Sequence, residues 1–574
     1  MTLQNVKYSI GILMLLSVIN GFGQFNGRSP LDIPLELSGS YGELRGSHFH
    51  AGMDFKTQQR EGFPVYAIAD GEVVRLLVST TSYGKAIYFR TTQGVMSVYG
   101  HLSQFVEPLA SAVKQYQYAK KSFEIDLTPQ RPYTFKKGDL LGYSGNTGSS
   151  GGPHLHFEMR NSAGDQAINP GLFGYAVKDN IPPTLSTLAV YPNNFNLFPL
   201  KQDLSIHIPV IQNGNRYSIS PDTLNIYGRY AFGIDATDKA NGQPNVLGLY
   251  NMQVLIDDMP VFYWQLDSVG FGETSDINSF IDYAHYDSTR QRIQWTVVYP
   301  NNRLNVYKYN QNSGFFDFTT EGVYKVQIKV ADFYANTSTL SFYVNAQPAQ
   351  TIRKIEGYAP PRDTKLFEYQ KENSFSSEGI QITLPKNALY QTIDFAYSRK
   401  LPDSSHWFSD VHQVHHSGTP LCKSYTLKIR PKKLAPELLS KALIASVNKD
   451  GTLNAEGGSY KDGFVSIKIK KFCTFVVCID TIKPKIMPLN IVRNRVSMTQ
   501  DTLKFQISDD FSGIARDGYE AKIDGHWFLM EYDPKIKYLW GAVDTTLPKG
   551  KHRFELTVKD QKGNSSYYNA TIER

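Results

Sequence analysis

Short runs in which apolar and polar residues alternate recur along the chain of 574 residues, and they favour β-strands over helices. Tyr, Thr, Ile and Val fill many of the alternating positions, and the chain contains 36 Tyr and 33 Phe. Residues of these types pack well on a pleated sheet. We therefore expect a mainly β protein, and its length predicts about three to five domains that each bury a core.

The N-terminus is typical of an export signal. Lys7 precedes an apolar run at residues 10–19, and small residues follow at 20–23. The run is too short to span a bilayer comfortably, so we interpret residues 1–23 as a cleavable secretory signal, with an uncleaved anchor as the alternative. No later stretch approaches transmembrane length. We expect a mature chain without a membrane span, in the periplasm, the cell envelope or outside the cell.

The charge distribution gives little support to a polyanion-binding role. The net charge is +7 and is spread over the chain without a long basic block. This balance suits an anionic cell envelope, but solubility explains it equally well. No basic stripe or reading motif supports nucleic-acid binding, so we expect no nucleic-acid partner.

The cysteines are Cys422, Cys473 and Cys478, all in the C-terminal half. They lack C-x-x-C spacing, which argues against a structural zinc site or a redox motif. Two alternatives stay open: one disulfide from Cys422 to either of the others, or free buried thiols.

The most informative stretch is S-G-N-T-G-S-S-G-G-P-H-L-H-F-E at residues 144–158, a glycine-rich turn that leads into a short strand. Because alternate side chains of a strand share a face, His154 and His156 point the same way. Two imidazoles that converge after such a turn suit a divalent metal. Taken alone, most such pairs are buried or hydrogen-bonded histidines, so the upstream sequence decides the interpretation.

Three upstream residues could belong to the same site. His50 and Asp54 are four residues apart, a spacing that can present both on one face, and both are suitable zinc ligands. His101 lies at the end of a strand predicted at residues 94–103. Other predicted strands are separated by tight turns, including an Asp-Gly turn within residues 64–78. We expect an antiparallel sheet.

Five segments in this order resemble the M23 family of zinc metallopeptidases, the lysostaphin-like or LytM peptidoglycan endopeptidases. They are H-F-H-A-G-M-D, V-Y-A-I-A-D-G-E-V-V, V-Y-G-H-L-S, K-K-G-D-L-L-G and G-N-T-G-S-S-G-G-P-H-L-H-F-E. The resemblance covers roughly residues 40–172, and five ordered motifs are far more specific than any one of them. It implies an antiparallel-sheet peptidase domain that uses Zn²⁺ as its cofactor.

Residue by residue, the resemblance implies that His50, Asp54 and His156 are the protein ligands of zinc. It also implies that His101 and His154 are catalytic histidines that do not bind the metal. Three protein ligands leave a position open for water, which zinc activates. The two other imidazoles can accept the water proton, pass it to the leaving amine and stabilise the oxyanion. We favour His101 as general base, although spacing does not separate its role from that of His154.

Three further features lie near the predicted site. His48 could compete as a ligand, but we interpret it as a neighbouring residue because His50 is the one four residues before Asp54. Glu158 could orient His156, although we favour a plain structural carboxylate. An insertion at about residues 106–135 departs from the family pattern. It contains a helix predicted at residues 108–122, and we expect it to border the groove.

The C-terminal part contains an internal repeat. Residues 179–185 and 480–486 share the pattern D-x-I-x-P-x-apolar. Residues 322–338 and 550–566 share alternating apolar positions, then V-x-D, then Asn beside a hydroxyl residue. A strand, a turn and a last strand of this kind are typical of an immunoglobulin-like sandwich, so we expect two copies of one sandwich type.

Between the copies, residues 350–480 again predict β-strands, but their sequence pattern differs from that of the repeat. His412, His415 and His416 lie in a stretch that we interpret as a solvated polar loop rather than a second metal site. The expected organisation places a signal peptide at 1–23, the M23 domain at 24–178, an immunoglobulin-like sandwich at 179–349, a second type of β-sandwich at 350–479 and another immunoglobulin-like sandwich at 480–574.

The leading hypothesis is an exported zinc-dependent endopeptidase that hydrolyses peptide bonds in the stems or cross-links of peptidoglycan. The β-sandwich tail would then lie against the wall or an envelope protein. One alternative is a catalytically silent M23-like regulator that activates wall amidases, but the intact set of three ligands and two histidines argues against it. Another is an extracellular protease that acts on proteins, which the same catalytic residues would serve.

Overall fold

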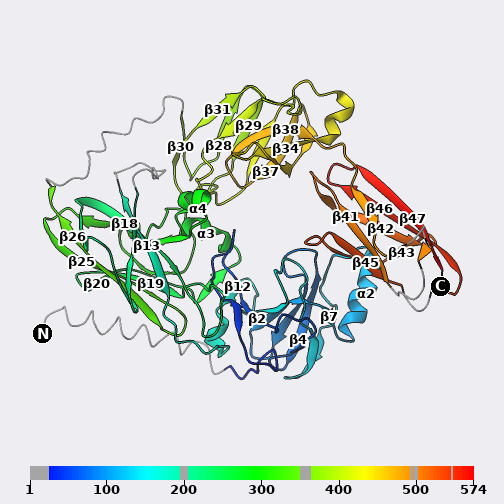
Figure 1. Ribbon diagram of the computed structural model, residues 1–574, viewed down its shortest axis with the longest axis horizontal. Helices are drawn as coiled ribbons and strands as arrows, with labels where there is room; N and C mark the ends of the chain where they lie inside the picture. Colours follow the sequence, from blue (N-terminus) through cyan, green and yellow to red (C-terminus); the bar gives the residue numbers. More distant parts are fainter. Residues whose placement is uncertain are drawn as a thin grey trace.

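The computed structural model describes residues 25–193, 205–348, 364–491, 495–496, 502–543 and 547–573, so the predicted secretory signal lies outside the described residues. Strands far outnumber helices within them, which confirms the prediction of a mainly β protein. The chain forms four β-rich parts that follow one another around a central opening (Figure 1). In the described part of the chain, no helix has the length and apolar character needed to cross a membrane.

The N-terminal part is built on an antiparallel sheet. Its strands alternate as predicted: Leu155 and Phe157 point into the hydrophobic core, and the two histidines beside them lie on the other face. The strand order is β1 (Leu37–Gly39), β2 (Met53–Lys56), β11 (His154–Arg160), β6 (Met96–Leu102), β5 (Lys85–Thr91), β4 (Gly71–Val78) and β8 (Ile125–Leu127), with β9 (Tyr133–Phe135) also on β4.

A second, small sheet packs against the first. It contains β3 (Pro64–Tyr66), β10 (Leu140–Tyr143) and β7 (Gln104–Phe105). The two strands predicted within residues 64–78 are present, but β3 pairs with β10 and β4 pairs with β5. The Asp-Gly turn thus carries the chain from one sheet to the other, and both Val65 and Val73 are fully buried in the core.

The predicted insertion helix is confirmed as α2 (Leu109–Lys120). Its buried residues are Leu109, Val113 and Gln117, which are spaced by four and therefore share one face of the helix.

The N-terminal part continues into the next part without a break in the core. β12 (Gln166–Ile168) pairs on one side with β11 and on the other with β21 (Ser268–Gly270). One hydrophobic cluster contains residues from both parts, and the rings of Phe49 and Phe280 contact each other at 5.3 Å between centroids. This shared core holds the two parts together.

That next part, the first sandwich, consists of two sheets. They are joined by short helices, α3 (Ile277–Phe280) and α4 (Tyr283–Thr289). One sheet contains β14 (Ile206–Pro209), β13 (Thr184–Pro192), β18 (Gly228–Thr237), β22 (Ile293–Trp295) and β24 (Phe316–Phe318). The other contains β15 (Ile211–Asn213), β16 (Arg216–Ser218), β17 (Thr223–Asn225), β26 (Thr337–Ala346), β25 (Gly322–Ala331), β19 (Asn251–Ile256), β20 (Met259–Gln265) and β23 (Tyr307–Asn310).

The middle sandwich has its own hydrophobic core. One sheet contains β28 (Asn373–Ser377), β29 (Ile380–Leu384), β33 (Tyr425–Ile429), β37 (Phe464–Ile469) and β36 (Ser459–Lys461). The other contains β31 (Tyr397–Lys400), β32 (Val411–Val414), β38 (Thr474–Ile479), β34 (Ala442–Val447) and β35 (Leu453–Gly457), and a separate pair is formed by β27 (Lys365–Phe367) and β30 (Ile393–Phe395). The three cysteines named above are free thiols.

The histidines of this middle sandwich correct a prediction. His412 lies on β32 and His415 directly follows it, and each is only 1% exposed. His412 contacts the Tyr397 hydroxyl, and His415 stacks on Phe395. The prediction of a solvated loop is wrong for His412 and His415, because aromatic side chains from other strands cover them. His416 is exposed, as expected.

The C-terminal sandwich repeats features of the first. One sheet contains β39 (Lys485–Pro488), β41 (Thr502–Ser508), β45 (Tyr538–Ala542) and β44 (Glu531–Asp533). The other contains β40 (Arg495–Val496), β47 (Ser565–Glu573), β46 (Lys551–Asp560), β42 (Ile514–Ile523) and β43 (His526–Phe528). The turn from β46 to β47 matches the turn from β25 to β26: Asn564 donates to Asp560, as Asn336 donates to Asp332, at 2.6 Å in each case.

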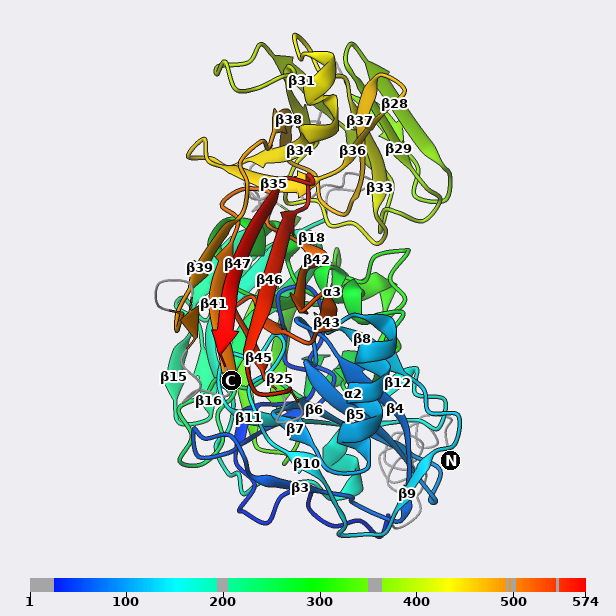
Figure 2. The ribbon, with the colours of Figure 1, turned by 90° about the vertical axis from the view of Figure 1, so that its right-hand side faces the viewer.

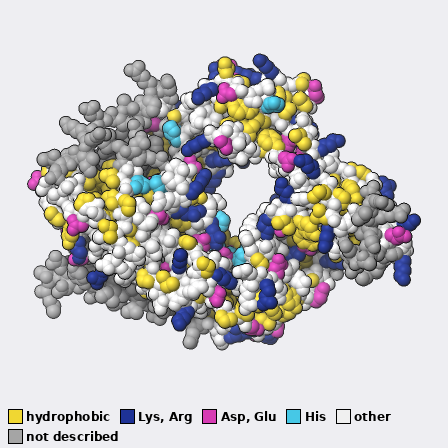
Figure 3. Space-filling model, viewed as in Figure 1, with side chains coloured by type: hydrophobic (Ala, Val, Ile, Leu, Met, Phe, Trp, Pro, Cys, Tyr) yellow, Lys and Arg dark blue, Asp and Glu magenta, His cyan; other side chains and the backbone are white. Residues whose placement is uncertain are grey.

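The C-terminal sandwich returns to the N-terminal part and closes a ring (Figure 1), and the turned view shows its strands alongside α2 (Figure 2). Lys85 Nζ lies 2.9 Å from Glu531 Oε2, and the rings of Tyr118 and Trp527 meet edge to face at 5.1 Å. The central opening is visible in the space-filling view, with histidine side chains on its lower rim, over the N-terminal part (Figure 3).

Candidate metal centre

Neighbouring strands bring the predicted site residues together. β11 lies between β2 and β6, and His156 is paired with Asp54 on one side and Gly100 on the other. Cross-strand partners point to the same face of a sheet, so Asp54 and His156 project together. A side chain at position 100 would press on His156, because a Cβ there would lie 3.3 Å from the His156 Cβ.

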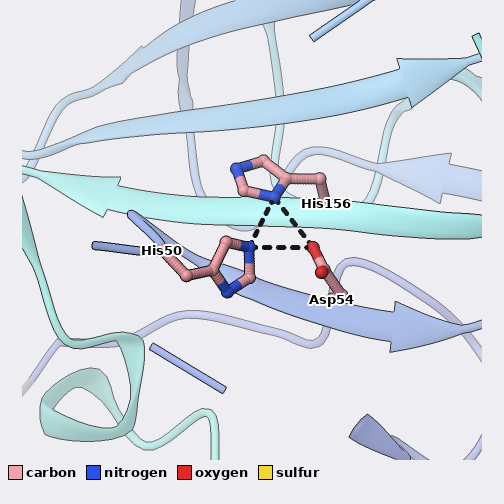
Figure 4. A group of neighbouring side chains, drawn as sticks. All are labelled: His50, Asp54 and His156. Carbon is pink, nitrogen blue, oxygen red and sulfur yellow. Dashed lines mark hydrogen bonds and ion pairs between the residues drawn. The ribbon is translucent and has the colours of Figure 1, made fainter. Parts of the chain in front are cut away.

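His50, Asp54 and His156 form a compact triad (Figure 4). His50 Nε2 lies 3.1 Å from His156 Nδ1 and 3.1 Å from Asp54 Oδ1, and His156 Nδ1 lies 2.8 Å from the same Asp54 oxygen. The three residues are 5–7% exposed. Three electron-donating atoms therefore converge on one point in a nearly dry environment.

Each member of the triad is oriented by a partner behind it. His50 Nδ1 lies 2.7 Å from the Ser40 carbonyl oxygen, and His156 Nε2 lies 2.8 Å from Glu158 Oε1. Because carbonyl and carboxylate oxygens only accept, these ring nitrogens carry the protons, and in the neutral rings the opposite nitrogens present lone pairs to the centre. The other Asp54 oxygen accepts a bond of 2.9 Å from Arg45 Nη2.

The charges of the triad depend on each other. Burial favours the neutral form of Asp54, but the charge of His50 and hydrogen bonds from the neighbouring histidines outweigh it and hold the pKa of Asp54 well below its usual range. Burial alone would lower the pKa of His156, yet bonds to Asp54 and Glu158 raise this pKa to about 9. Without a metal, the proton that this pKa places on His156 Nδ1 occupies the position between the donors, and a bound metal ion would replace it.

The donor set fits a zinc ion. Two imidazole nitrogens and one carboxylate oxygen are common zinc ligands, and their bond lengths of about 2.0–2.1 Å place tetrahedral ligands about 3.3 Å from one another. The separations of 2.8–3.1 Å in the triad are close to this value. Partners that hold the outer ring nitrogens and the outer carboxylate oxygen are also typical of zinc sites.

The two other predicted histidines lie beside the triad. The ring of His101 is 4.7 Å from that of His154 and 5.6 Å from that of His156, between centroids. His101 has a left-handed backbone with φ of 59°, which interrupts the alternation of β6 next to Gly100. This unusual conformation accompanies a side chain that faces the centre from a strand position that would otherwise point away.

Hydrogen bonds also fix the tautomers of these two histidines. His101 Nδ1 lies 2.8 Å from the Thr147 carbonyl oxygen, and His154 Nδ1 lies 2.8 Å from that of Gly152. Both Nε2 atoms are therefore free of protons in the neutral rings. Burial, and then the charges of His156 and His154, lower the pKa of His101 to about 3.

Glu158 contacts a predicted metal ligand, although the sequence favoured a plain structural carboxylate, and the partners of Glu158 were not predicted. Glu158 is fully buried and lies between His156 and Arg160, whose Nε donates to Glu158 Oε2 at 2.6 Å. Arg160 also donates to the Tyr83 hydroxyl at 3.1 Å. The alternation in H-F-E-M-R places Glu158 and Arg160 on the same face of the strand as His156, and this alternation is the sequence signal that could have identified both residues. No local sequence pattern identifies Arg45, because a loop brings it to Asp54. His48 is exposed, as expected.

The insertion and the glycine-rich turn contact the C-terminal sandwich. Ser122, just after α2, donates to Asp517 at 3.1 Å, and Tyr118 of α2 contacts Trp527. Lys535 Nζ donates to the carbonyl oxygens of Asn146 and Ser150 in the turn that leads to His154. The C-terminal sandwich therefore borders the approach to the candidate centre.

Comparison with known sequences decides the family of the N-terminal part. The model of peptidase family M23 matches residues 48–125, a segment that includes His50, Asp54 and His101. The chain contains a peptidase M23 domain. A second family model, the Zu5-like domain, matches residues 364–480, which correspond to the middle sandwich.

Curated relatives match part of the chain. An "Uncharacterized metalloprotease" of Haemophilus influenzae is 36% identical over 121 residues, which are 21% of this chain and 20% of the relative. "DD-carboxypeptidase/endopeptidase Mpg" of Neisseria gonorrhoeae is 32% identical over 121 residues, 21% of this chain and 22% of the relative. "Glycyl-glycine endopeptidase ALE-1" of Staphylococcus capitis is 31% identical over 148 residues, 25% and 32%. The chain thus spans only about a fifth to a third of these relatives.

Solved structures also match part of the chain. The catalytic domain of lysostaphin from Staphylococcus simulans is 24% identical, covers 28% of this chain and 97% of its own, and has a TM-score of 0.18. The catalytic domain of the M23 protein EnpA from Enterococcus faecalis is 22% identical, covers 26% and 99%, and has a TM-score of 0.20.

Proposed function

We propose that the chain is an exported, zinc-dependent endopeptidase that hydrolyses peptide bonds in the stems or cross-links of peptidoglycan. The observation that carries this proposal is the convergence of His50, Asp54 and His156, with two further histidines beside them. The names of the relatives, a DD-carboxypeptidase/endopeptidase and a glycyl-glycine endopeptidase, support the choice of wall peptides as substrate. The export part of the proposal rests on the secretory signal predicted at residues 1–23.

The triad would hold the metal through His50 Nε2, Asp54 Oδ1 and His156 Nδ1. When bound, zinc would activate a water molecule and polarise the scissile carbonyl group. The outer bonds to Ser40 and Glu158 keep both imidazoles in the tautomer that can ligate. Because these orienting groups are in place before any ligand binds, little reorganisation is needed at the centre.

His101 and His154 would handle protons and charge. The bond from His101 Nδ1 to Thr147 leaves Nε2 able to accept a proton from the attacking water and to return it to the leaving amine. His154, held by Gly152, lies next to it and can stabilise charge on the carbonyl oxygen once it is protonated. We assign the general base to His101, because its ring lies near those of His154 and His156.

The experiment that tests the proposal is a digest of purified peptidoglycan with the mature chain, followed by mass spectrometry of the released muropeptides. We expect products in the presence of zinc, no products with a chelator, and recovery when zinc is added back. A chain that binds zinc but releases nothing would instead be a regulator, and cleavage restricted to added proteins would indicate an extracellular protease.

A matched pair of variants ties the result to the centre. His50→Ala removes a predicted ligand, and we expect it to lose both zinc and activity. His48→Ala changes an exposed histidine two residues away and should leave both unchanged. Equal effects of the two substitutions would contradict the assignment of His50.

A further inference from the structure

Three aspartates converge where the M23 domain leads into the first sandwich. Asp179 lies in the connecting segment before β13, Asp238 follows β18 and Asp332 follows β25. One carboxylate oxygen from each lies within 4.8 Å of the others. Asp238 and Asp332 are only 4% and 2% exposed, and Asp179 is half-buried. We call this group the junction cluster.

The junction cluster contains buried oxygens without a hydrogen-bond donor. They are Oδ1 of Asp238 and Oδ2 of Asp179. A buried carboxylate oxygen without a partner is costly, because it has lost its water and gained nothing in return. Native structures rarely leave such groups without a proton, a water or an ion. These two oxygens therefore point to a ligand at this place.

The charges of the cluster are also uncompensated. Burial of its side chain and, to a smaller extent, the charge of Asp332 raise the pKa of Asp238 to about 8. Burial likewise raises the pKa of Asp332 to about 6. Among the described residues, no lysine or arginine forms an ion pair with any of the three aspartates.

The backbone holds the cluster in place. Asp332 Oδ1 accepts bonds from the backbone N–H groups of Tyr334 and Asn336, and its Oδ2 accepts from the Asn336 side chain. Asp179 Oδ1 accepts from the N–H of Ile181 at 3.0 Å. The carboxylates are thus fixed before a ligand arrives, and the oxygens of Asp238 and Asp179 that lack donors stay available.

We propose that the junction cluster is a binding site for a hard divalent cation, Ca²⁺. Carboxylate oxygens are the ligands that such ions prefer, and nitrogen or sulfur donors are absent from the cluster. Ca²⁺ accepts irregular arrangements and completes its shell with carbonyl groups and water, whereas Mg²⁺ demands near-octahedral geometry. The ion would tie the segment that leaves the M23 domain to two strands of the first sandwich.

The C-terminal sandwich holds a second cluster at the equivalent positions, and it serves as an internal comparison. Asp480, Asp509 and Asp560 also lie within 4.8 Å of one another. Here Asp480 accepts from the N–H groups of Ile482 and Ser512, one on each oxygen, and Asp560 is bonded on both oxygens as well. Since these two aspartates are satisfied by the protein, we restrict the proposal to the junction cluster.

The test is equilibrium dialysis of the zinc-loaded full-length chain with Ca²⁺, combined with thermal unfolding. We expect saturable Ca²⁺ binding that raises the unfolding temperature. Asp238→Asn should weaken this binding at least tenfold. Without Ca²⁺, the same variant should be about as stable as the parent chain, because burial and Asp332 already hold the Asp238 carboxyl in its neutral form near pH 7. A substitution that merely damaged the fold would instead lower stability in both conditions.

Asp509→Asn is the matched control, and it should keep the Ca²⁺ binding that Asp238→Asn loses. Asp179→Asn, at the half-buried edge of the cluster, repeats the test should Asp238→Asn fail to fold. The proposal is overturned if the parent chain binds no Ca²⁺, if the folded Asp238→Asn variant (or Asp179→Asn in its place) binds as much as the parent chain, or if Asp509→Asn loses the same component.

Discussion

The Nε2 atom of His156 lies 2.8 Å from Oε1 of Glu158, and both side chains are buried. Arg160 and His156 outweigh the effect of burial and lower the pKa of Glu158 to about 2, so this carboxylate is charged. Glu158→Gln keeps the shape but removes the charge that holds His156. We expect zinc affinity to fall about 10- to 100-fold, the range for groups that orient metal-bound histidines. Competition with a chromophoric chelator measures this change.

Glu72→Gln provides the control for this prediction. Glu72 lies on β4 of the same domain and makes only a long surface contact of 3.5 Å to Arg90. Its loss should leave zinc affinity unchanged. If Glu158→Gln retained the affinity of the parent chain while staying folded, Glu158 would be the plain structural carboxylate that the sequence favoured.

Substitution of His101 should separate metal binding from turnover. His101→Ala removes a ring that contacts the centre but has no place in the triad. We expect zinc content to stay the same and the rate of muropeptide release to fall about 10²- to 10⁴-fold, the usual contribution of a general acid–base group. Elemental analysis and a timed digest measure the two quantities. Loss of zinc in this variant would place His101 among the ligands instead.

Much of the site could be predicted because its parts lie on regular strands. The two-residue period put His154 and His156 on one face, and antiparallel pairing then placed Asp54 opposite His156. Arg45 was beyond reach for the opposite reason. It stands in a loop, where no period relates sequence position to direction, and its contact with Asp54 exists only after the loop has folded.

The closed arrangement of the four parts and the burial of His412 and His415 were not predicted, because both depend on contacts between residues that are far apart in the sequence. Glu531 lies far from Lys85 in the sequence, and a polar strand gives no sign of the domain that it will touch. His415 has polar neighbours in sequence, but Phe395 and Phe472 cover it in space. The β character of each sandwich followed from local alternation, whereas the placement of the sandwiches did not.

Removal of the ring-closing contacts should release the C-terminal sandwich from the M23 domain. Glu531→Ala combined with Lys535→Ala deletes the bonds to Lys85 and to the glycine-rich turn. Polar contacts near the surface contribute only about 0–1 kcal/mol each. A third change, Trp527→Ala, therefore also removes the contact between the aromatic rings of Trp527 and Tyr118. We expect a larger radius of gyration in X-ray scattering and faster hydrogen exchange at residues 144–153.

The control for opening of this closed arrangement changes an ion pair elsewhere in the same sandwich, on β46. Arg553 and Glu555 lie 2.8 Å apart, and Arg553 is 69% exposed. Alanine at both positions should leave the scattering curve and the exchange unchanged. An unaltered radius of gyration in the triple variant would mean that other contacts hold the ring closed.

Acidification should destabilise the Zu5-like domain through its buried histidines. Burial lowers the pKa of His412 to about 4, and burial with the charge of His416 lowers that of His415 to about 3. The unfolded chain takes up these protons near pH 6.5, so it binds more protons than the folded chain between that pH and the folded pKa values. The stabilising effect is therefore present above pH 6.5 and is lost as the pH falls, by about 2 kcal/mol per histidine at pH 5.

Scanning calorimetry at pH 7 and pH 5 measures this loss, and His415→Gln should reduce it. Glutamine does not titrate, yet its side-chain oxygen can still accept the bond that the Ala396 N–H donates to His415 Nδ1. His406→Gln, at an exposed position, should leave the difference between the two pH values as it is. If His415→Gln kept the full acid sensitivity, the proton uptake would have to come from other groups, because a side chain without a titrating proton cannot supply it.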